Sequence, residues 1–158
     1  MIKRSEKLAF MQVESGNETV FKRLTGFTEF SISKNPREYS RKYLDEDMER
    51  SEVMGYSTSI TYKFDADPES EVHQLLYGVA DRELIGSEAE VTVVIADLST
   101  IKNGVCNATK RKYSVIPSVE GDDTDTYTVS GTLRAAGKNE FGTAESSDDW
   151  QTITFTEN

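Results

Sequence analysis

The stretch that decides the fold is Tyr56-Ser57-Thr58-Ser59-Ile60-Thr61-Tyr62-Lys63-Phe64, in which the side chains alternate in character with a period of two. The larger and more apolar residues, such as Ile60 and Phe64, take the even positions. Small or charged residues, such as Ser57 and Lys63, take the odd ones. Because successive side chains point to opposite faces of a strand, this pattern predicts a β-strand with one buried face.

The same period recurs along the chain. Residues 126–135 alternate in the same way, and Gly131 takes an inward position that predicts a bulge or a close backbone contact. Residues 90–97 are rich in Val and Ile and predict a more fully buried strand. Other segments have the β-branched and aromatic content of strands, which makes about seven or eight strands in all: 7–13, 27–34, 107–117 and 150–156.

One segment changes to the helical period. Asp67 suits the N-cap position and Pro68 suits the first helical position. Apolar residues then recur at i, i+3, i+4 and i+7: Val72, Leu75, Leu76 and Val79. This spacing predicts one amphipathic helix over about 68–83, whose apolar face packs on a sheet.

Residues 34–52 fit neither period and carry charges of both signs. A connector of this length is unusual in a compact domain, so it is either an interaction arm or a solvated excursion. The fold prediction is therefore a mainly β chain of the α+β type, with a single domain over 1–158. It is an antiparallel β-sandwich with one flanking amphipathic helix and a long charged loop over about 35–54.

Composition narrows the classes of function. The 158 residues include 28 acidic and 18 basic side chains, for a formal net charge of −10. An acidic chain disfavours nucleic-acid binding, which draws on contacts between cations and phosphates. The single cysteine, Cys106, allows no intrachain disulfide and points to a reduced compartment. No apolar run is long enough to span a membrane, and no signal-peptide core is expected.

The inventory of chemical groups predicts no catalytic residue, cofactor or metal. The only histidine, His73, is expected on the solvent side of the helix, and Cys106 is expected to be a small packed residue. The acidic run 120–125 lacks the spacing of a calcium-binding loop and predicts a solvated turn. The basic triplet 110–112 lies in a predicted strand, so its side chains alternate between faces.

Pieces spread along the whole chain carry a resemblance to a known family. The sequence resembles the major tail tube proteins of long-tailed bacteriophages and of related phage-tail-like particles from Gram-positive hosts. The pieces that carry the likeness are 27–36 (FTEFSISKNP), 38–46 (EYSRKYLDE), 55–64, 113–117 (YSVIP), 120–122 (EGD), 141–144 (FGTA) and 148–152 (DDWQT).

The resemblance implies a structural virion protein located in the tail and made in the bacterial host cytoplasm. It implies hexameric rings stacked into a hollow tube that conducts DNA without binding it specifically. The implied partners are further copies of the chain, a tape measure protein, tail terminator and baseplate or distal tail proteins, and a possible sheath protein. Neither a cofactor nor a membrane is implied.

In this role the loop is expected to cross to a neighbouring subunit, where mixed charges set register and aromatic residues anchor the contact. The residues expected in that contact are Arg37, Tyr39, Arg41, Tyr43, Leu44, Met48 and Arg50. Acidic and polar side chains are expected to line the bore. The polar candidates are Ser57, Ser59, Thr61, Thr126, Thr128, Ser130 and Thr132.

Three other interpretations stay open. The first is a monomeric Ig-like binding or decoration module of a virion. The second is the inner tube of a contractile bacteriocin or secretion system, since fold alone does not choose among such tubes. The third is an enzyme, which the empty catalytic inventory disfavours.

Overall fold

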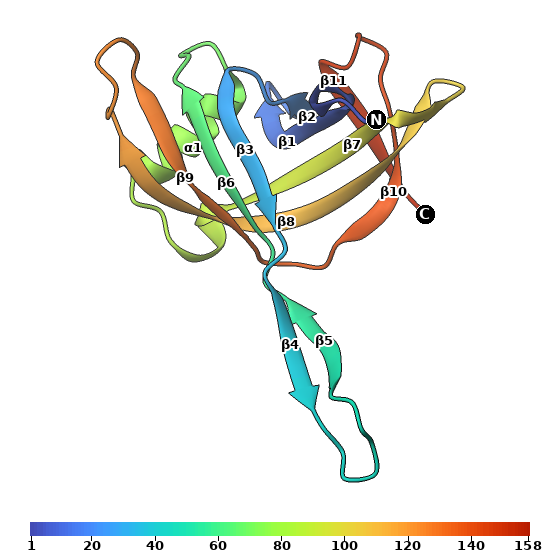
Figure 1. Cartoon of the computed structure of the whole chain (residues 1–158). Helices are drawn as coiled ribbons and strands as arrows, with labels where there is room; N and C mark the ends of the chain where they lie inside the picture. Colours follow the sequence, from blue (N-terminus) through green and yellow to red (C-terminus); the bar gives the residue numbers. More distant parts are fainter.

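The computed structural model describes residues 1–158, apart from the side chain of Ser15. The described chain forms eleven strands and one α-helix, α1 (Glu71–Asp81), with two short 3-10 turns, η1 (Arg4–Glu6) and η2 (Gly86–Ala89) (Figure 1). The strands are β1 (Lys7–Ser15), β2 (Glu18–Arg23), β3 (Phe27–Ser33), β4 (Pro36–Arg41), β5 (Arg50–Tyr56), β6 (Ser59–Asp65), β7 (Glu90–Lys102), β8 (Val105–Glu120), β9 (Thr128–Ala135), β10 (Glu140–Glu145) and β11 (Thr152–Glu157).

The main sheet closes on itself. Its strand order is β10-β11-β2-β1-β7-β8-β9-β6-β3, and β10 also pairs with β8, so six of these strands form a closed antiparallel barrel. Strand β8 makes the closure possible because it is 16 residues long. One of its edges pairs with β10 over residues 105–110 and then with β9 over residues 113–120.

The predicted sandwich is therefore not confirmed. A sandwich needs two separate sheets packed face to face, whereas here one sheet branches at β8 into a barrel and a three-strand extension, β9-β6-β3. The predictions of a mainly β, antiparallel chain and of one helix against the sheet are confirmed.

The close contact predicted at Gly131 is confirmed. The register between β8 and β9 shifts after the pair Pro117–Gly131, where β8 has a bulge. A Cβ atom on Gly131 would lie 2.6 Å from the carbonyl oxygen of Ile116 and 2.7 Å from the hydroxyl of Tyr62. Only glycine lets the two backbones approach this closely.

Two apolar cores lie on opposite sides of the shared strands. Inside the barrel, small residues fill the narrow space around Phe10: Ala96, Cys106, Ala108 and Ala144. On the outer side, α1 covers the sheet and buries a larger set of side chains, which includes Met11, Ile60, Tyr62, Phe64, Leu76, Val93, Val129 and Leu133. Strands β1, β7 and β8 alternate between the two cores, as the period of two requires.

Helix α1 begins three residues later than predicted. Its N-cap is Ser70, whose hydroxyl accepts a hydrogen bond from the backbone N–H of His73 at 3.3 Å. Asp67 instead closes a turn before the helix, where its carbonyl accepts from the N–H of Ser70 at 3.2 Å.

Within the described residues, no helix is long and apolar enough to cross a membrane.

His73 is buried, so the prediction of a solvent-facing histidine is wrong. Its side chain is 2% exposed and stacks on Phe64 with ring centroids 4.4 Å apart. Nδ1 accepts from the backbone N–H of Asp67 at 3.0 Å, and Nε2 lies 2.6 Å from the carbonyl oxygen of Thr25. With both ring nitrogens bonded to backbone, the imidazole is satisfied inside the core and has a structural role.

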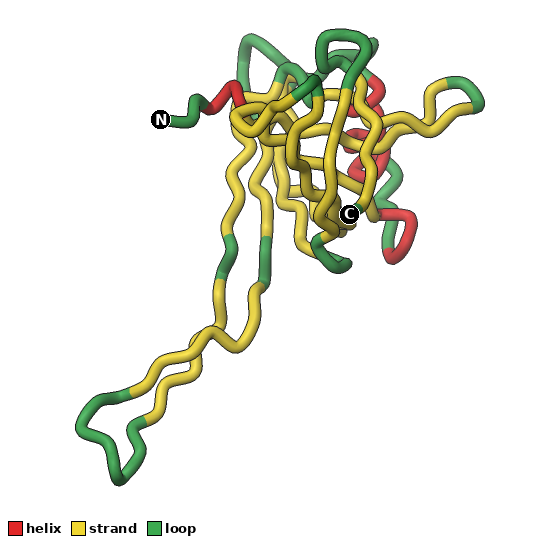
Figure 2. Tube along the Cα trace, turned by 90° about the vertical axis from the view of Figure 1, so that its right-hand side faces the viewer, coloured by secondary structure: helices red, strands yellow, loops and turns green.

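Four strands lie outside the predicted set. Strands β2 and β10 complete the barrel. Strands β4 and β5 make a separate two-stranded hairpin from the segment expected to be a charged loop. Figure 2 shows this hairpin projecting away from the barrel as an arm. We call residues 34–56 the arm below.

Candidate assembly surfaces

The arm stands clear of the body (Figures 1 and 2). Every residue of β4 and all residues of β5 except Gly55 are exposed. The two strands are paired antiparallel, and the hydroxyls of Ser40 and Ser51 lie 2.9 Å apart across the ladder. A two-stranded hairpin with no packed face is marginally stable alone, so this shape is suited to contact with another molecule.

All seven predicted contact residues lie on the arm, and four of them share one face. Arg37, Tyr39 and Arg41 alternate along β4, and the register places Arg50 of β5 directly opposite Arg41. We call these four residues the arginine face. Glu52 lies on the same face, opposite Tyr39, so the face carries one carboxylate beside its three guanidinium groups and stays net cationic. Because like charges directly opposite each other on a hairpin are unfavourable, this face gains from an anionic partner.

The other three predicted residues lie at the tip. The N–H of Glu46 bonds to the carbonyl of Tyr43 at 3.1 Å and closes a turn that leaves Leu44 and Met48 exposed. Arg50 holds this turn through two contacts of 2.7 Å with the carboxylate of Glu46, and its guanidinium lies 5.8 Å from the centre of the Tyr43 ring. Arg50 is thus engaged within the arm.

Exposed apolar residues on β5 escaped the sequence analysis. Val53, Met54 and Tyr56 are all more than half exposed. Val53 and Met54 fell in the segment expected to be a charged loop. Tyr56 was expected on the buried face of the strand 56–64, and that prediction is wrong, because Tyr56 ends β5 and is 61% exposed. These side chains extend the apolar surface of the arm beyond the tip.

Strand β3 is an open edge of the main sheet, because β6 is its only partner in the described chain. In its ladder with β6, alternate residues aim their backbone groups at the partner and at the open side. The carbonyl of Phe30 faces the open side, where Nη2 of Arg4 donates to it at 3.2 Å. The same guanidinium bonds to the carbonyl of Lys7 at 2.7 Å, so η1 covers part of this edge.

The end of β8 offers a second open edge. Its pairing with β7 stops at Ser114, while its pairing with β9 continues to Glu120. Residues 115–120 therefore have a partner on one side only. Pro117 lies in this segment, which suits an edge because proline has no N–H to donate.

The face of the extension that lies opposite α1 is polar. Thr61 of β6 lies between Ser31 of β3 and Thr132 of β9, and Lys63 lies beside Ser130. The candidates for a bore lining do not all share this position. Ser59 and Thr128 are buried, and Thr126 lies in the loop before β9, where it donates to Asp65 at 3.0 Å.

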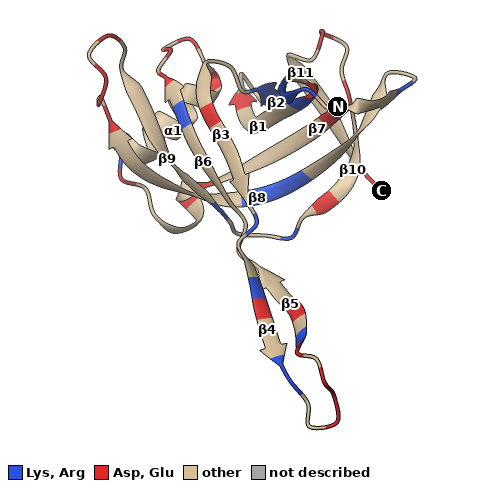
Figure 3. Ribbon diagram, in the orientation of Figure 1, with Lys and Arg blue, Asp and Glu red and all other residues tan. Residues whose placement is uncertain are grey.

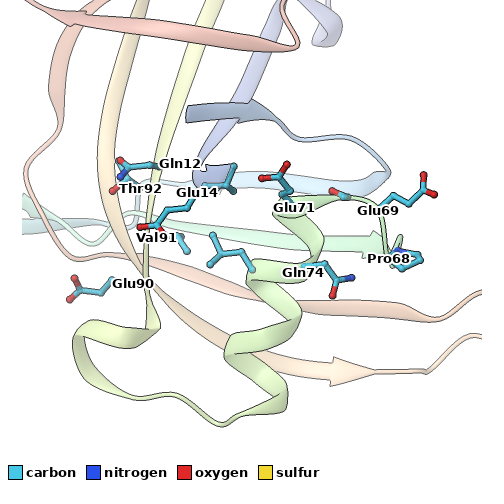
Figure 4. A pocket seen from close by; sticks show the side chains of 12 residues that line it. Gln12, Glu14, Pro68, Glu69, Glu71, Gln74, Glu90, Val91 and Thr92 are labelled. Atoms are coloured by element: carbon cyan, nitrogen blue, oxygen red, sulfur yellow. The ribbon is translucent and has the colours of Figure 1, made fainter. Parts of the chain in front are cut away.

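An acidic groove of about 560 Å³ lies between the start of α1 and strands β1 and β7 (Figure 4). Four carboxylates line it: Glu14, Glu69, Glu71 and Glu90. Lys22 lies 2.6 Å from Glu71, and Lys112 lies 3.8 Å from Glu90. Two of the four charges are thus balanced within the chain. No local pattern in the sequence predicts this groove, because its residues come from three separate segments.

The acidic loop between β8 and β9 is organised by its own hydrogen bonds. Asp122 accepts from the hydroxyl of Thr128 and pairs with Lys63 at 3.5 Å. The Thr128 bond is the main reason that the pKa of Asp122 is lowered.

Among the described residues, no group of three or more His, Cys, Asp or Glu side chains is arranged to hold a metal ion.

The loop between β10 and β11 is held by one carboxylate. Asp148 accepts from the hydroxyl of Thr152 at 2.6 Å and from its backbone N–H at 3.0 Å, and it also accepts from Ser146. These bonds, led by the Thr152 hydroxyl, lower the pKa of Asp148 to about 2.

Cys106 lies inside the barrel with its thiol 3.7 Å from the carbonyl of Ala144, and burial raises the pKa of that thiol.

Comparison with solved structures finds a similar fold. A chain in the cryo-EM structure of the anti-feeding prophage baseplate, 6-fold symmetrised, superposes with a TM-score of 0.52 at 11% sequence identity. The match covers 86% of this chain and 91% of that chain. At this identity the likeness concerns the fold. No protein-family model and no curated protein sequence matches the chain.

Proposed function

We propose that this chain is a structural subunit of a phage tail or phage-tail-like particle. Its copies join side by side into six-membered rings, and the rings stack into the tail tube. The observation that carries the proposal is that the sheet extension ends in two open edges, β3 on one side and residues 115–120 of β8 on the other. Open edges are templates for strands of another chain.

The directions of the strands support this joining. Neighbours in the series β8-β9-β6-β3 are all antiparallel, so β3 and β8 run in opposite directions. When β3 of one copy lies beside β8 of the next, the new pair is therefore antiparallel as well. Because the contact joins two different surfaces, repetition by a rotation of one sixth of a turn closes a ring and pairs both open edges of the extension.

The fold comparison supports the particle type and the ring size. The similar chain belongs to a prophage baseplate that was solved with six-fold symmetry, and nearly the whole of both chains is covered. The same likeness is compatible with the inner tube of a contractile bacteriocin or secretion system, which is the second candidate. A Gram-positive host is suggested only by the sequence resemblance, and the fold comparison does not bear on it.

The polar face of the extension gives the ring its bore. In a ring joined through β3 and β8, one face of the extension lines the inside, and α1 covers the other. Short hydroxyl side chains such as Thr61 and Thr132 offer DNA no cationic contact, and Lys63 on the same face is paired with Asp122 at 3.5 Å. Arg134, opposite Ser59, is the other cation of this face, and the net charge of −10 disfavours phosphate binding overall. A hydroxyl-rich bore lets DNA pass without specific binding.

The proposed partners follow from this role. They are further copies of the chain, a tape measure protein in the bore, tail terminator and baseplate proteins at the two ends, and a sheath protein in a contractile system. We propose no enzymatic activity and no cofactor. A monomeric decoration module is the remaining alternative, and it predicts a protein that stays single at high concentration.

The decisive experiment is negative-stain microscopy of the purified protein combined with sedimentation over a range of concentrations. Rings or tubes are expected. A monomer at millimolar concentration that forms no particle would contradict the proposal and favour the decoration module.

Blocking the β3 edge tests the way the ring closes. Ile32 lies on the same side of the ladder as Phe30, so its N–H faces the open edge. The substitution Ile32→Pro removes that donor without removing a bond to β6. We expect folded monomers that form no rings, whereas the control Ile32→Val assembles normally. Normal rings from a folded Ile32→Pro protein would place the ring contact elsewhere.

Deletion of residues 38–50 tests the arm. Because β4 and β5 pair only with each other, and the bonds from Asn35 to Ser57 and Ser59 at the base are kept, the shortened protein is expected to retain its fold and its melting temperature. Tube formation is expected to fail. Tubes at normal yield would show that the arm is a solvated excursion.

A further inference from the structure

The arm and the acidic loops lie at opposite ends of the same strands. Strand β3 leads into the arm and β6 leaves it, so both strands meet the arm at one end. The other end of β6 is Asp65, which pairs with Thr128 at the start of β9. The loop before α1 and the loop between β8 and β9 therefore lie together at the end far from the arm, as Figure 3 also shows.

Exposed carboxylates gather at that far end. Four of them come from these two loops, and we call them the acidic rim: Asp67, Glu69, Asp123 and Asp125. The N–H of Asp125 bonds to the carboxylate of Asp123 at 2.8 Å, which gives the second loop a defined shape. In Figure 3 acidic residues mark these loops, whereas Lys and Arg mark the base of the arm, and its strands and tip carry charges of both signs.

The arginine face carries guanidinium groups that can bind additional carboxylates. Arg41 and Arg50 lie opposite each other in the hairpin, and Arg37 is on the same side of β4. Within the arm, only Arg50 has a carboxylate partner, Glu46, among the ion pairs of the described residues. Guanidinium groups bind carboxylates in a bidentate way, and arginine and tyrosine are favoured at contacts between proteins.

We infer that the arginine face of one copy binds the acidic rim of a second copy that lies end to end with it. The partner surface is carboxylate-rich, and the contact sets the direction of stacking, with the arm of each copy directed at the loops of the next. Since the two surfaces lie at opposite ends of the strands, copies aligned along the strands bring them together without turning either copy. The inference rests on the proposed function, for which it names the contact between rings.

Charge reversal on both surfaces tests this contact. The arm variant carries Arg37→Glu and Arg41→Glu, and it leaves Arg50 in place because Arg50 holds the tip. The rim variant carries Asp123→Arg and Asp125→Arg. A third protein combines all four changes. The matched control carries Lys102→Glu and Arg82→Glu, two exposed cations outside both surfaces. Melting curves establish that each protein is folded.

The readout is the protein concentration needed for tubes, measured by sedimentation and microscopy at low and high salt. Each reversal alone is expected to raise this concentration roughly tenfold or more, since it places like charges across a contact. The combined protein is expected to return to within about threefold of the unmodified one, and the control to remain unchanged. For the unmodified protein, added salt is expected to raise the concentration.

The outcomes distinguish a failure of the proposed function from a failure of the inferred contact. If the unmodified protein never assembles, the proposed function fails. If it assembles and either reversal leaves the concentration unchanged, the proposed function stands and the arginine face does not bind the acidic rim. The inference is likewise overturned if both reversals block tubes but the combined protein does not recover.

Discussion

His73 donates a hydrogen bond from Nε2 to the carbonyl oxygen of Thr25, 2.6 Å away, and so ties α1 to the connection between β2 and β3. The proton lies on Nε2 because Nδ1 accepts from the N–H of Asp67, which can only donate. One buried side chain thus joins the helix to the turn that precedes it and to a connection 48 residues away in sequence. Gly26 leaves room for it, since a Cβ there would lie 3.1 Å from the ring.

The substitution His73→Ala is expected to destabilise the fold by about 3 kcal/mol, because it leaves a cavity and two backbone groups without their partner. Chemical denaturation of this variant and of Gln74→Ala, a matched change at the next and exposed position, measures the difference. A loss no larger for His73→Ala than for Gln74→Ala would contradict the structural role of the imidazole.

The hydroxyl of Tyr62 is buried, and within the described part of the chain it has no hydrogen-bond partner. The substitution Tyr62→Phe is therefore expected to stabilise the fold by about 1 kcal/mol. Burial, with a contribution from Glu120, also raises the pKa of Tyr62 to about 12. Between pH 10 and 12 the unfolded chain loses this proton before the folded one, so stability falls as pH rises.

Tyr62→Phe should remove this contribution to the alkaline loss of stability. Melting temperatures of both proteins from pH 8 to 12 measure it, and the advantage of the variant is expected to grow with pH. Parallel curves for the two proteins would show that the hydroxyl is solvated.

The substitution Gly131→Ala is expected to cost about 3 kcal/mol or more, because its methyl group would overlap the carbonyl of Ile116 and the hydroxyl of Tyr62. Adding Tyr62→Phe should recover part of this loss but not all of it, since the backbone contact remains. Denaturation of the two single variants and the double variant forms a complete cycle. Strict additivity would contradict the contact with the hydroxyl.

The substitution Asp148→Asn is expected to lower the melting temperature at neutral pH, because an amide accepts fewer hydrogen bonds than the carboxylate that now binds Thr152 and Ser146. The lowered pKa means that this stabilisation is present above about pH 4 and is lost as pH falls toward 2. Melting curves at pH 7 and pH 2 test this: the two proteins should differ at the first and coincide at the second. A constant difference at both pH values would point to packing instead.

The substitution Arg4→Ala is expected to leave the melting temperature nearly unchanged, because the residue is exposed and surface hydrogen bonds contribute little. It should promote self-association, since it uncovers the carbonyl of Phe30 on the β3 edge. Light scattering during assembly measures the effect, with Lys3→Ala as the control. Slower assembly of Arg4→Ala would show that η1 takes part in the contact instead of covering it.

The local patterns of the sequence determined the strand character of β6 and β9, the apolar stripe of α1 and the close approach at Gly131. They also located the segment that stands apart from the core. This segment is the arm, and all seven predicted contact residues lie on it. Such features can be derived from sequence because they depend on residues a few positions apart, through the periods of two and 3.6.

Tertiary structure alone decided the closure of the barrel, because it depends on β8 pairing with β10 at one end and β9 at the other. The same holds for β10, whose residues have a weak pattern and become a strand through pairing with β8 and β11. It also decided the burial of His73, whose partner Thr25 is 48 residues away in sequence. Pairing between distant segments produces no periodic pattern in the sequence. Only the tertiary structure therefore reveals which segments pair.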